Sequence, residues 1–133
     1  MTRRESRENA FIIAFEKLFR DDDIAEIISA AKEADGFETD EFCERAALGV
    51  FAHIEELDRM ISEKSTGWKI ERLSSVARTA ARLALYEILF EEEIPESVSI
   101  NEAVELCKKY GSEGDAPFVN GMLGTIVREL GRG

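Results

Sequence analysis

Residues 76–90 read VARTAARLALYEILF, a segment dominated by apolar and small residues. Its apolar side chains recur at the spacing of one helical face and its flanks: Val76, Ala80, Leu83, Ala84, Leu85, Ile88 and Leu89. A helix that is apolar over so wide an arc is typical of the buried centre of a bundle. Ser74 precedes it as a candidate N-cap, and Pro95 ends it because a proline disfavours helical geometry in the residue before it. We therefore predict that this helix is the central one of the fold.

Three further helices are predicted before the central segment. The first covers about residues 3–20 and the second about residues 24–35, each with a stripe of apolar residues at helical spacing. The third is predicted as one long helix over about 39–64, because its apolar residues keep the helical period throughout. Residues 65–67 (Ser-Thr-Gly) are the clearest internal break, and Trp68 opens the second half of the chain.

Two helices are predicted after the central segment. Residues 99–102 (Ser-Ile-Asn-Glu) have the pattern of a capping box, in which the serine caps an amide and the glutamate reaches back. We therefore expect a helix to begin at Ser99. Pro117 is placed just inside the start of the last helix, where its missing N–H is tolerated. No segment alternates with period two, so we expect essentially no sheet.

The chain has 133 residues, which is the size of one ordinary domain. Its apolar fraction of 44% and charged fraction of 34% are those of a globular protein. We predict an all-α fold, a compact bundle of six to seven helices forming one domain over 1–133. It is expected to have two subdomains, an N-terminal helical part over about 3–64 and a C-terminal helical part over about 68–130.

Composition also bears on the cellular setting. The sequence has no run of roughly 20 apolar residues that would cross a bilayer and no apolar core of signal-peptide type, so we expect a cytoplasmic protein. Cys43 and Cys107 lie within helical patterns and are expected to be free, buried thiols, since disulfides are rare in the cytosol. With a single histidine, His53, and no CxxC pair, we expect no transition-metal site.

Catalytic patterns are absent from the sequence. His53 lies beside an apolar helical stripe and is expected to be packed or half-exposed rather than to act as a base. Neither cysteine has a histidine placed near it, and the glycines form neither a GxxxxGK[ST] nor a GxGxxG phosphate-binding loop. We therefore predict that the protein is not an enzyme and requires no cofactor.

The net charge of −11 is unevenly distributed. Residues 1–20 carry five basic and three acidic side chains, whereas residues 21–64 carry fourteen acidic and four basic ones. Residues 65–133 carry eleven acidic and eight basic side chains. An acidic middle segment repels polyanions and favours basic partners, so a nucleic acid would have to approach the first helix or the C-terminal half.

Arg3, Arg4 and Arg7 lie on one side of the first predicted helix. Guanidinium groups bind phosphate through paired hydrogen bonds and stack on bases, so this cluster is a candidate RNA contact. The alternative is a solubilising first turn, with Glu8 partly neutralising Arg4. The pair Arg78 and Arg82 is better explained by salt bridges to neighbouring acidic helices than by RNA contact. The basic, aromatic helix end from Lys108 to Tyr110 is explained by favourable charge at a helix C-terminus.

Several motifs together resemble the NusB family of bacterial transcription antitermination factors. They are RLALYEI (82–88), the IP pair (94–95), VSINEAVEL (98–106), FVNGML (118–123) and the RRxxRE start (3–8). The resemblance covers nearly the whole chain and is closest between about Val76 and Leu123. It implies an all-helical fold of two subdomains and a function without catalysis.

The resemblance also implies the partners. Proteins of this family bind the boxA RNA element of nascent ribosomal RNA transcripts together with the ribosomal protein NusE, and they join other Nus factors on RNA polymerase. By position, Arg3, Arg4 and Arg7 match the RNA-binding start of the family, and Phe118 and Asn120 match the segment close to the same RNA path. An aromatic ring and an amide suit single-stranded RNA, which offers base faces and base edges.

Two departures from the family pattern are expected to weaken binding of RNA by this chain alone. Pro117 stands where a lysine is frequent, and Phe15 stands where a tyrosine is frequent. An alternative is therefore a protein-only helical adaptor with little RNA affinity of its own. Members of the family occur as monomers and as dimers, so the sequence leaves a homodimer open.

Overall fold

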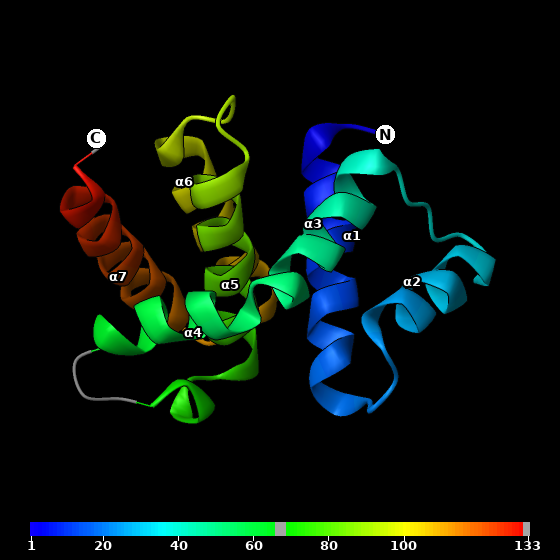
Figure 1. Ribbon diagram of the computed structural model, residues 1–133, viewed down its shortest axis with the longest axis horizontal. Coiled ribbons are helices and arrows are strands. Elements are labelled where there is room, and N and C mark those ends of the chain that lie inside the picture. Colours follow the sequence, from blue (N-terminus) through cyan, green and yellow to red (C-terminus); the bar gives the residue numbers. More distant parts are fainter. Residues whose placement is uncertain (66–68, 132–133) are drawn as a thin grey trace.

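The structure, a computed structural model, describes residues 1–65 and 69–131. Within them the chain forms seven α-helices and two short 3₁₀ helices, and none of these residues lies in a β-strand (Figure 1). In chain order the elements are α1 (Arg3–Glu16), η1 (Lys17–Phe19), α2 (Ile24–Glu33), α3 (Glu41–Ala52), α4 (Ile54–Glu63), η2 (Ile70–Arg72), α5 (Ser75–Phe90), α6 (Glu96–Tyr110) and α7 (Asp115–Leu130). The predicted all-α fold of six to seven helices is confirmed.

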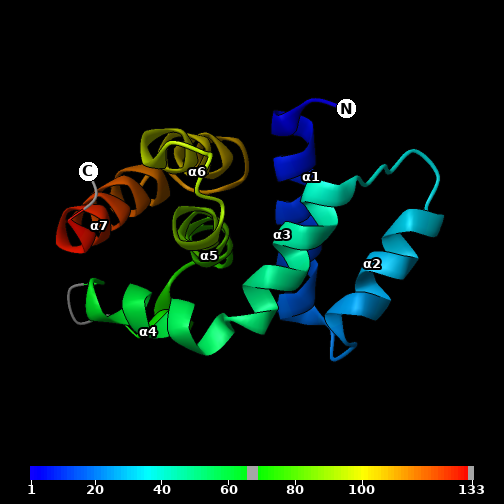
Figure 2. The same ribbon diagram turned by 45° about the horizontal axis from the view of Figure 1, so that its top comes forward.

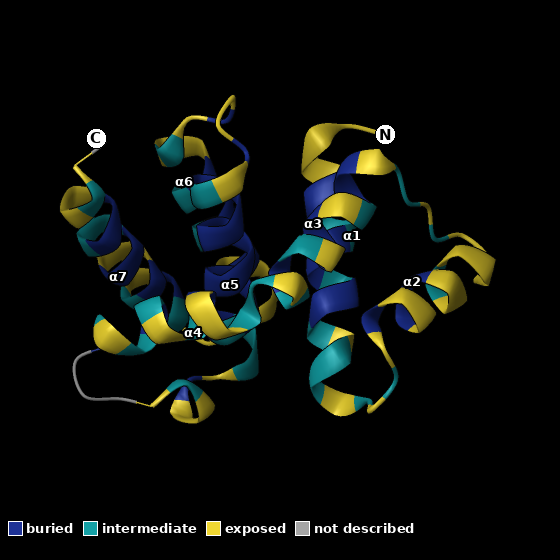
Figure 3. Cartoon of the chain, viewed as in Figure 1, coloured by how far each residue is buried: buried dark blue, intermediate teal, exposed yellow. Residues whose placement is uncertain are grey.

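Helix α5 lies at the centre of the fold, as its wide apolar arc predicts. Eleven of its sixteen residues are buried, and it packs against α1, α3, α4, α6 and α7. Figure 2 views it nearly end-on, with α6 on one side and α4 on the other, and Figure 3 shows how strongly it is buried. Ser74 Oγ accepts a hydrogen bond from the Ala77 N–H at 3.0 Å, which confirms Ser74 as the N-cap.

The start of α1 is fixed by a capping box formed by Thr2 and Glu5. Thr2 Oγ1 accepts a hydrogen bond from the Glu5 N–H at 3.1 Å, and the Thr2 N–H donates to Glu5 Oε1 at 2.8 Å. The α-helix ends at Glu16 and continues as the 3₁₀ turn η1, so the predicted helix over 3–20 is correct in position and shorter at its end. The capping box therefore determines where the arginine-bearing turn begins.

The prediction of one continuous helix over about 39–64 is wrong. The helix breaks at His53, whose φ of −116° and ψ of 20° separate α3 from α4. Both halves pack on α5, and α3 packs on α1 as well, so the chain changes direction between them. His53 is half-buried, as expected, and its ring stacks on Phe90 with centroids 4.1 Å apart. The apolar period continues through the break because both halves face α5.

The prediction that a helix begins at Ser99 is also wrong. Helix α6 begins at Glu96, directly after Pro95, so Ser99 lies in its first turn. The Ser99 hydroxyl donates to Glu87 Oε1 at 3.0 Å in the core, and Glu102 turns toward two arginines of α1. The motif thus serves contacts between helices rather than a helix cap. Pro117 is the third residue of α7, within its first turn as expected.

Helices α1, α2 and α3 pack together, as do α5, α6 and α7, and α1 and α3 join the two groups through α5. Helix α4, which the predicted N-terminal part includes, packs mainly on α5. Most of the predicted break over 65–67, and Trp68, lie outside the described residues. The division near 64–68 stays a prediction, and the packing of α4 favours a boundary at His53 instead.

Both cysteines are free and buried, as predicted. Burial raises the pKa of Cys43 to about 11 and that of Cys107 to about 12, so both remain thiols at neutral pH.

Across the described residues, the structure contains no helix with the length and apolar character of a membrane span. Those same residues include no group of three His, Cys, Asp or Glu side chains placed to share a metal ion.

Candidate nucleic-acid interface

Arg3 lies on the exposed first turn of α1. Its guanidinium carbon is 4.0 Å from the centroid of the Phe42 ring, a cation–π contact with a buried residue of α3. This contact holds the guanidinium against α3, while Arg3 remains exposed at the surface. Arg3 is therefore oriented by the fold and accessible, as a phosphate-binding arginine has to be.

Arg4 lies on the side of α1 that faces α6. Its Nε and Nη2 donate to the two carboxylate oxygens of Glu102 at 3.0 and 2.7 Å. The Arg4 side chain is 73% exposed, whereas that of Glu102 is only 10% exposed. The hydrogen bond from Arg4 is the largest influence that holds the pKa of Glu102 below its ordinary value, so this carboxylate is ionised at neutral pH.

Arg7 is buried, in contrast to the exposed cluster suggested by its spacing from Arg3. Its Nε and Nη2 donate to Glu87 of α5 at 2.7 and 2.9 Å, and its Nη1 donates to Glu102 at 3.1 Å. The Arg7 side chain is 5% exposed and that of Glu87 is fully buried, with the Ser99 hydroxyl as a further donor to Glu87. Arg7 therefore ties α1 to both α5 and α6, and the protein itself satisfies its guanidinium.

Glu8 pairs with the end of α6 rather than with Arg4. Its Oε2 accepts hydrogen bonds from Lys109 Nζ at 2.5 Å and from the Tyr110 hydroxyl at 2.8 Å. The bond from Lys109 is the largest influence that lowers the pKa of Glu8. The Tyr110 ring also stacks on Phe11, with centroids 5.3 Å apart. The basic, aromatic end of α6 is thus a docking point for α1.

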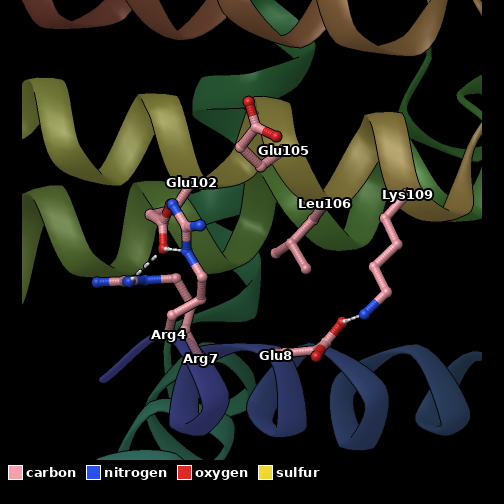
Figure 4. A pocket seen from close by; sticks show the side chains of 7 residues that line it. All are labelled: Arg4, Arg7, Glu8, Glu102, Glu105, Leu106 and Lys109. Carbon is pink, nitrogen blue, oxygen red and sulfur yellow. Dashed lines mark hydrogen bonds and ion pairs between the residues drawn. The ribbon is translucent and has the colours of Figure 1, made fainter. Parts of the chain in front are cut away.

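These pairs line a groove of about 240 Å³ between α1 and α6, shown in Figure 4. The walls carry the side chains of Arg4, Arg7, Glu8, Glu102, Glu105, Leu106 and Lys109. A second, more open groove of about 540 Å³ shares Arg4, Arg7 and Glu102 with the first and also includes Arg3, with Ile94, Pro95 and Val98 as its apolar residues. The arginine-bearing turn therefore lines two grooves of a size that can receive parts of an extended chain.

Phe118 and Asn120 lie on the first two turns of α7. Phe118 is half-buried and packs against the core, and Asn120 is exposed, with the fully buried Val119 between them. The hydrogen bonds that gather Arg4 and Arg7 around Glu102 do not include either residue. The structure thus brings Arg4 and Arg7 together, and it places Phe118 and Asn120 on the helix that follows Lys109 and Tyr110.

The second arginine pair has a structural explanation. Arg82 donates from Nε and Nη2 to the two oxygens of Asp58, both at 2.8 Å, and so links α5 to α4. Arg78 donates to the carbonyl oxygens of Glu71 and Leu73, and burial lowers its pKa. The interpretation of these residues as salt-bridge and packing residues is confirmed for Arg82.

Glu102 and Glu87 have roles at this site that the sequence motifs do not predict, since the pattern at 99–102 indicates a helix cap for Glu102. Their spacing carries one signal, because both lie on faces otherwise occupied by apolar residues and a buried carboxylate requires a cationic partner. Arginines distant in sequence are the available partners.

The chain matches the NusB family over residues 4–128. It is 42% identical over 129 residues to the transcription antitermination protein NusB of Exiguobacterium sp., an alignment that covers 97% of this chain and 99% of that protein. It is 45% identical over 127 residues to the protein of the same name from Agathobacter rectalis, covering 92% and 97%.

Solved structures agree with the sequence matches. The structure of T. maritima NusB superposes with a TM-score of 0.85 at 36% identity, covering 97% of this chain and 92% of that one. A structure of antitermination factors NusB and NusE in complex with double-stranded RNA contains a chain with a TM-score of 0.85 at 28% identity, covering 96% of each. In sequence and in fold, over nearly its whole length, this chain belongs to the NusB family.

Proposed function

We propose that this chain is a transcription antitermination factor that binds the boxA element of nascent ribosomal RNA transcripts together with the ribosomal protein NusE. In this role it joins other Nus factors on RNA polymerase, acts without catalysis or cofactor, and works in the cytoplasm, where transcripts emerge. The names of its relatives and the NusB–NusE–RNA complex of a structural neighbour support the proposal.

The observation that carries the RNA-binding part is the arrangement of the first turn of α1. Arg3 and Arg4 project into solvent from a strongly acidic chain, each oriented by a neighbouring helix; Arg4 lines both grooves and Arg3 lines the larger one. Oriented guanidinium groups lose less conformational entropy when they bind phosphate. We assign phosphate contact to Arg3 and Arg4. Arg7 contributes indirectly to the RNA site, because its hydrogen bond to Glu87 fixes α1 against α5.

Phe118 and Asn120 form the proposed second part of the RNA site. Phe118 packs against the core and is only partly buried, so its ring has exposed surface on which an unpaired base can stack. Asn120 is exposed and offers both a donor and an acceptor to a base edge. Lys109, at the end of α6, lies in the groove between α1 and α6 and adds a cation to the arginine-bearing part of the site.

The acidic segment supports the protein-binding part. Residues 21–64 hold most of the excess negative charge, and they form α2, α3 and α4. Ribosomal proteins are generally basic, so this surface attracts such a partner and accelerates its encounter with the chain.

A titration of labelled boxA RNA with and without NusE tests the proposal at near-physiological salt. We expect weak binding by the chain alone and clearly tighter binding by the pair. Binding of NusE without any increase in RNA affinity would favour the second candidate function, a protein-only adaptor. One observation supports that alternative: Arg4 and Arg7 already have glutamate partners within the chain. Absence of both interactions would contradict both functions.

A further inference from the structure

The groove between α1 and α6 is electrically balanced although it carries the arginines of the proposed RNA site. Its walls present three cations, Arg4, Arg7 and Lys109, and three carboxylates, Glu8, Glu102 and Glu105. Figure 4 shows that the carboxylates of Glu102 and Glu8 point at the cations across the groove. A polyanion that enters therefore meets cations that are already paired.

The geometry at Glu102 makes this pairing competitive with phosphate. Arg4 uses the edge formed by Nε and Nη2 for its two bonds to Glu102, the same fork that binds a phosphate in the bidentate manner. A phosphate on the remaining edge of the guanidinium would lie close to the Glu102 carboxylate and be repelled by it. Full engagement of Arg4 with RNA thus requires Arg4 to leave Glu102.

The departure of Arg4 from Glu102 does not dismantle the fold. Arg7 keeps two bonds to Glu87 and one to Glu102, so Glu102 stays held by Arg7 when Arg4 moves away. Arg4 is largely exposed and has room to swing into either groove. The mobile partner is therefore the surface arginine, and the carboxylate remains in place.

We propose that Glu102, supported by Glu8, is an intramolecular counter-ion that competes with RNA phosphate for the basic residues of the groove. The inference rests on the proposed RNA-binding function and assigns to Glu102 a role in setting the affinity for RNA. Glu102 acts through Arg4, and Glu8 acts through Lys109 in the same way. Such competition lowers the RNA affinity of the chain, both alone and in the complex with its partner protein.

The decisive variant is Glu102→Gln, which keeps the size of the side chain and removes its charge. We expect its affinity for labelled boxA RNA, measured with NusE present, to rise about two- to fivefold, the range of a single partly exposed ion pair. The dependence of log affinity on log salt should become steeper by up to about 0.7. In the parent, salt weakens both the phosphate contact and the internal ion pair that competes with it, and these effects partly cancel; in Glu102→Gln only the phosphate contact is weakened.

Glu105→Gln is the matched control, since Glu105 lies one turn further along α6 in the same groove and forms its ion pair with Lys108, at 3.6 Å. Its attraction for Arg4 is much smaller than that of Glu102, which is hydrogen-bonded to Arg4. A general effect of net charge would raise affinity equally in both variants, and that result would overturn the proposal. Glu102→Asp, which restores the charge, should return affinity toward that of the parent. In the Arg4→Ala background, Glu102→Gln should give no gain.

The outcomes separate this inference from the function on which it rests. Failure of every variant to bind RNA would contradict the proposed function and this inference together. RNA binding by the parent with no gain in Glu102→Gln would overturn the inference alone. If circular dichroism shows that Glu102→Gln does not fold, Glu8→Gln tests the proposal instead. Glu8 is more exposed than Glu102, and its neutralisation removes the ion pair with Lys109. A gain would then support the proposal, and parent-like affinity would contradict it.

Discussion

Arg7 of α1 donates two hydrogen bonds to the fully buried carboxylate of Glu87 on α5, at 2.7 and 2.9 Å. This contact joins the first helix of the chain to the central one across 80 positions of sequence. It explains why one member of the arginine cluster serves the fold while its neighbours remain at the surface. A buried pair of this kind contributes little net stability when intact and costs much when one partner is removed.

The first prediction concerns stability of the arginine variants. Arg7→Ala leaves Glu87 buried without its charged partner, so we expect it to lower the free energy of unfolding by about 3–5 kcal/mol. Arg4→Ala removes a partner that is mostly exposed and should cost less than about 1 kcal/mol. Urea denaturation followed by circular dichroism measures both. Equal losses in the two variants would show that Arg7 has no special structural role.

The second prediction concerns the close approach of α3 to α5. A Cβ atom at Gly49 would lie 2.2 Å from the Tyr86 ring, so Gly49→Ala should destabilise the protein by about 1–3 kcal/mol. At Gly121, in the interior of α7, an added Cβ meets no atom within 4 Å, and Gly121→Ala should stabilise by about 0.5–1 kcal/mol. Thermal melting of the two variants should therefore shift in opposite directions. A higher melting temperature for Gly49→Ala would refute the packing described at this crossing.

The third prediction concerns acid sensitivity at Glu91. Arg45 donates to both of its oxygens at 2.8 and 3.0 Å, and this hydrogen bonding is the largest influence that lowers the pKa of Glu91 below 4.5. A carboxyl group with a lowered folded-state pKa stabilises the protein above its ordinary pKa. That contribution disappears as the pH falls through the lowered value. Unfolding free energies measured from pH 7 to below pH 4 should thus converge for the parent and Glu91→Gln.

Arg45→Ala provides the matching check on this assignment. It removes the main cause of the lowered pKa of Glu91, so the stability of this variant should fall less steeply with acid than that of the parent. A constant gap between the parent and Glu91→Gln over the whole pH range would instead indicate a role in packing alone.

The fourth prediction concerns the proposed second part of the RNA site. Asn120 is exposed, so Asn120→Ala should leave the melting temperature nearly unchanged and weaken binding of boxA RNA by about 0.5–1.5 kcal/mol. Thr125→Ala, on the same helix about one turn beyond, is the control and should bind as the parent does. Parent-like RNA affinity in Asn120→Ala would remove this residue from the site.

The sequence predicts the helices well because their apolar periodicity records burial directly. The wide arc over residues 76–90 identifies the central helix, since no other position in a bundle buries a helix on so many sides. The same signal misses the break at His53, because α3 and α4 both turn apolar faces toward α5 and the period continues through the junction. Periodicity reports which side is buried, and it does not report a change in direction between two helices with a shared partner.

The polar contacts of the site were harder to predict. Arg3, Arg4 and Arg7 look alike on a helical wheel, and only the tertiary structure buries Arg7 against Glu87 while it leaves Arg4 at the surface. The motif at 99–102 fits a helix cap and a buried network equally well, because serine and glutamate are suited to both. Pairings such as Arg4 with Glu102, 98 positions apart, depend on the fold, and local pattern does not contain them.

Salt-dependent binding of boxA RNA by the NusE complex of the Arg3→Ala/Arg4→Ala variant tests the central claim most directly. Arg59→Ala, an exposed arginine of α4, is the control for loss of a positive charge elsewhere. We predict that the double variant keeps its fold and its NusE affinity, binds RNA more weakly, and loses up to about 0.7 of the salt slope for each phosphate contact removed. RNA affinity and salt slope equal to those of the parent and of Arg59→Ala would contradict the assignment of RNA binding to the first turn of α1.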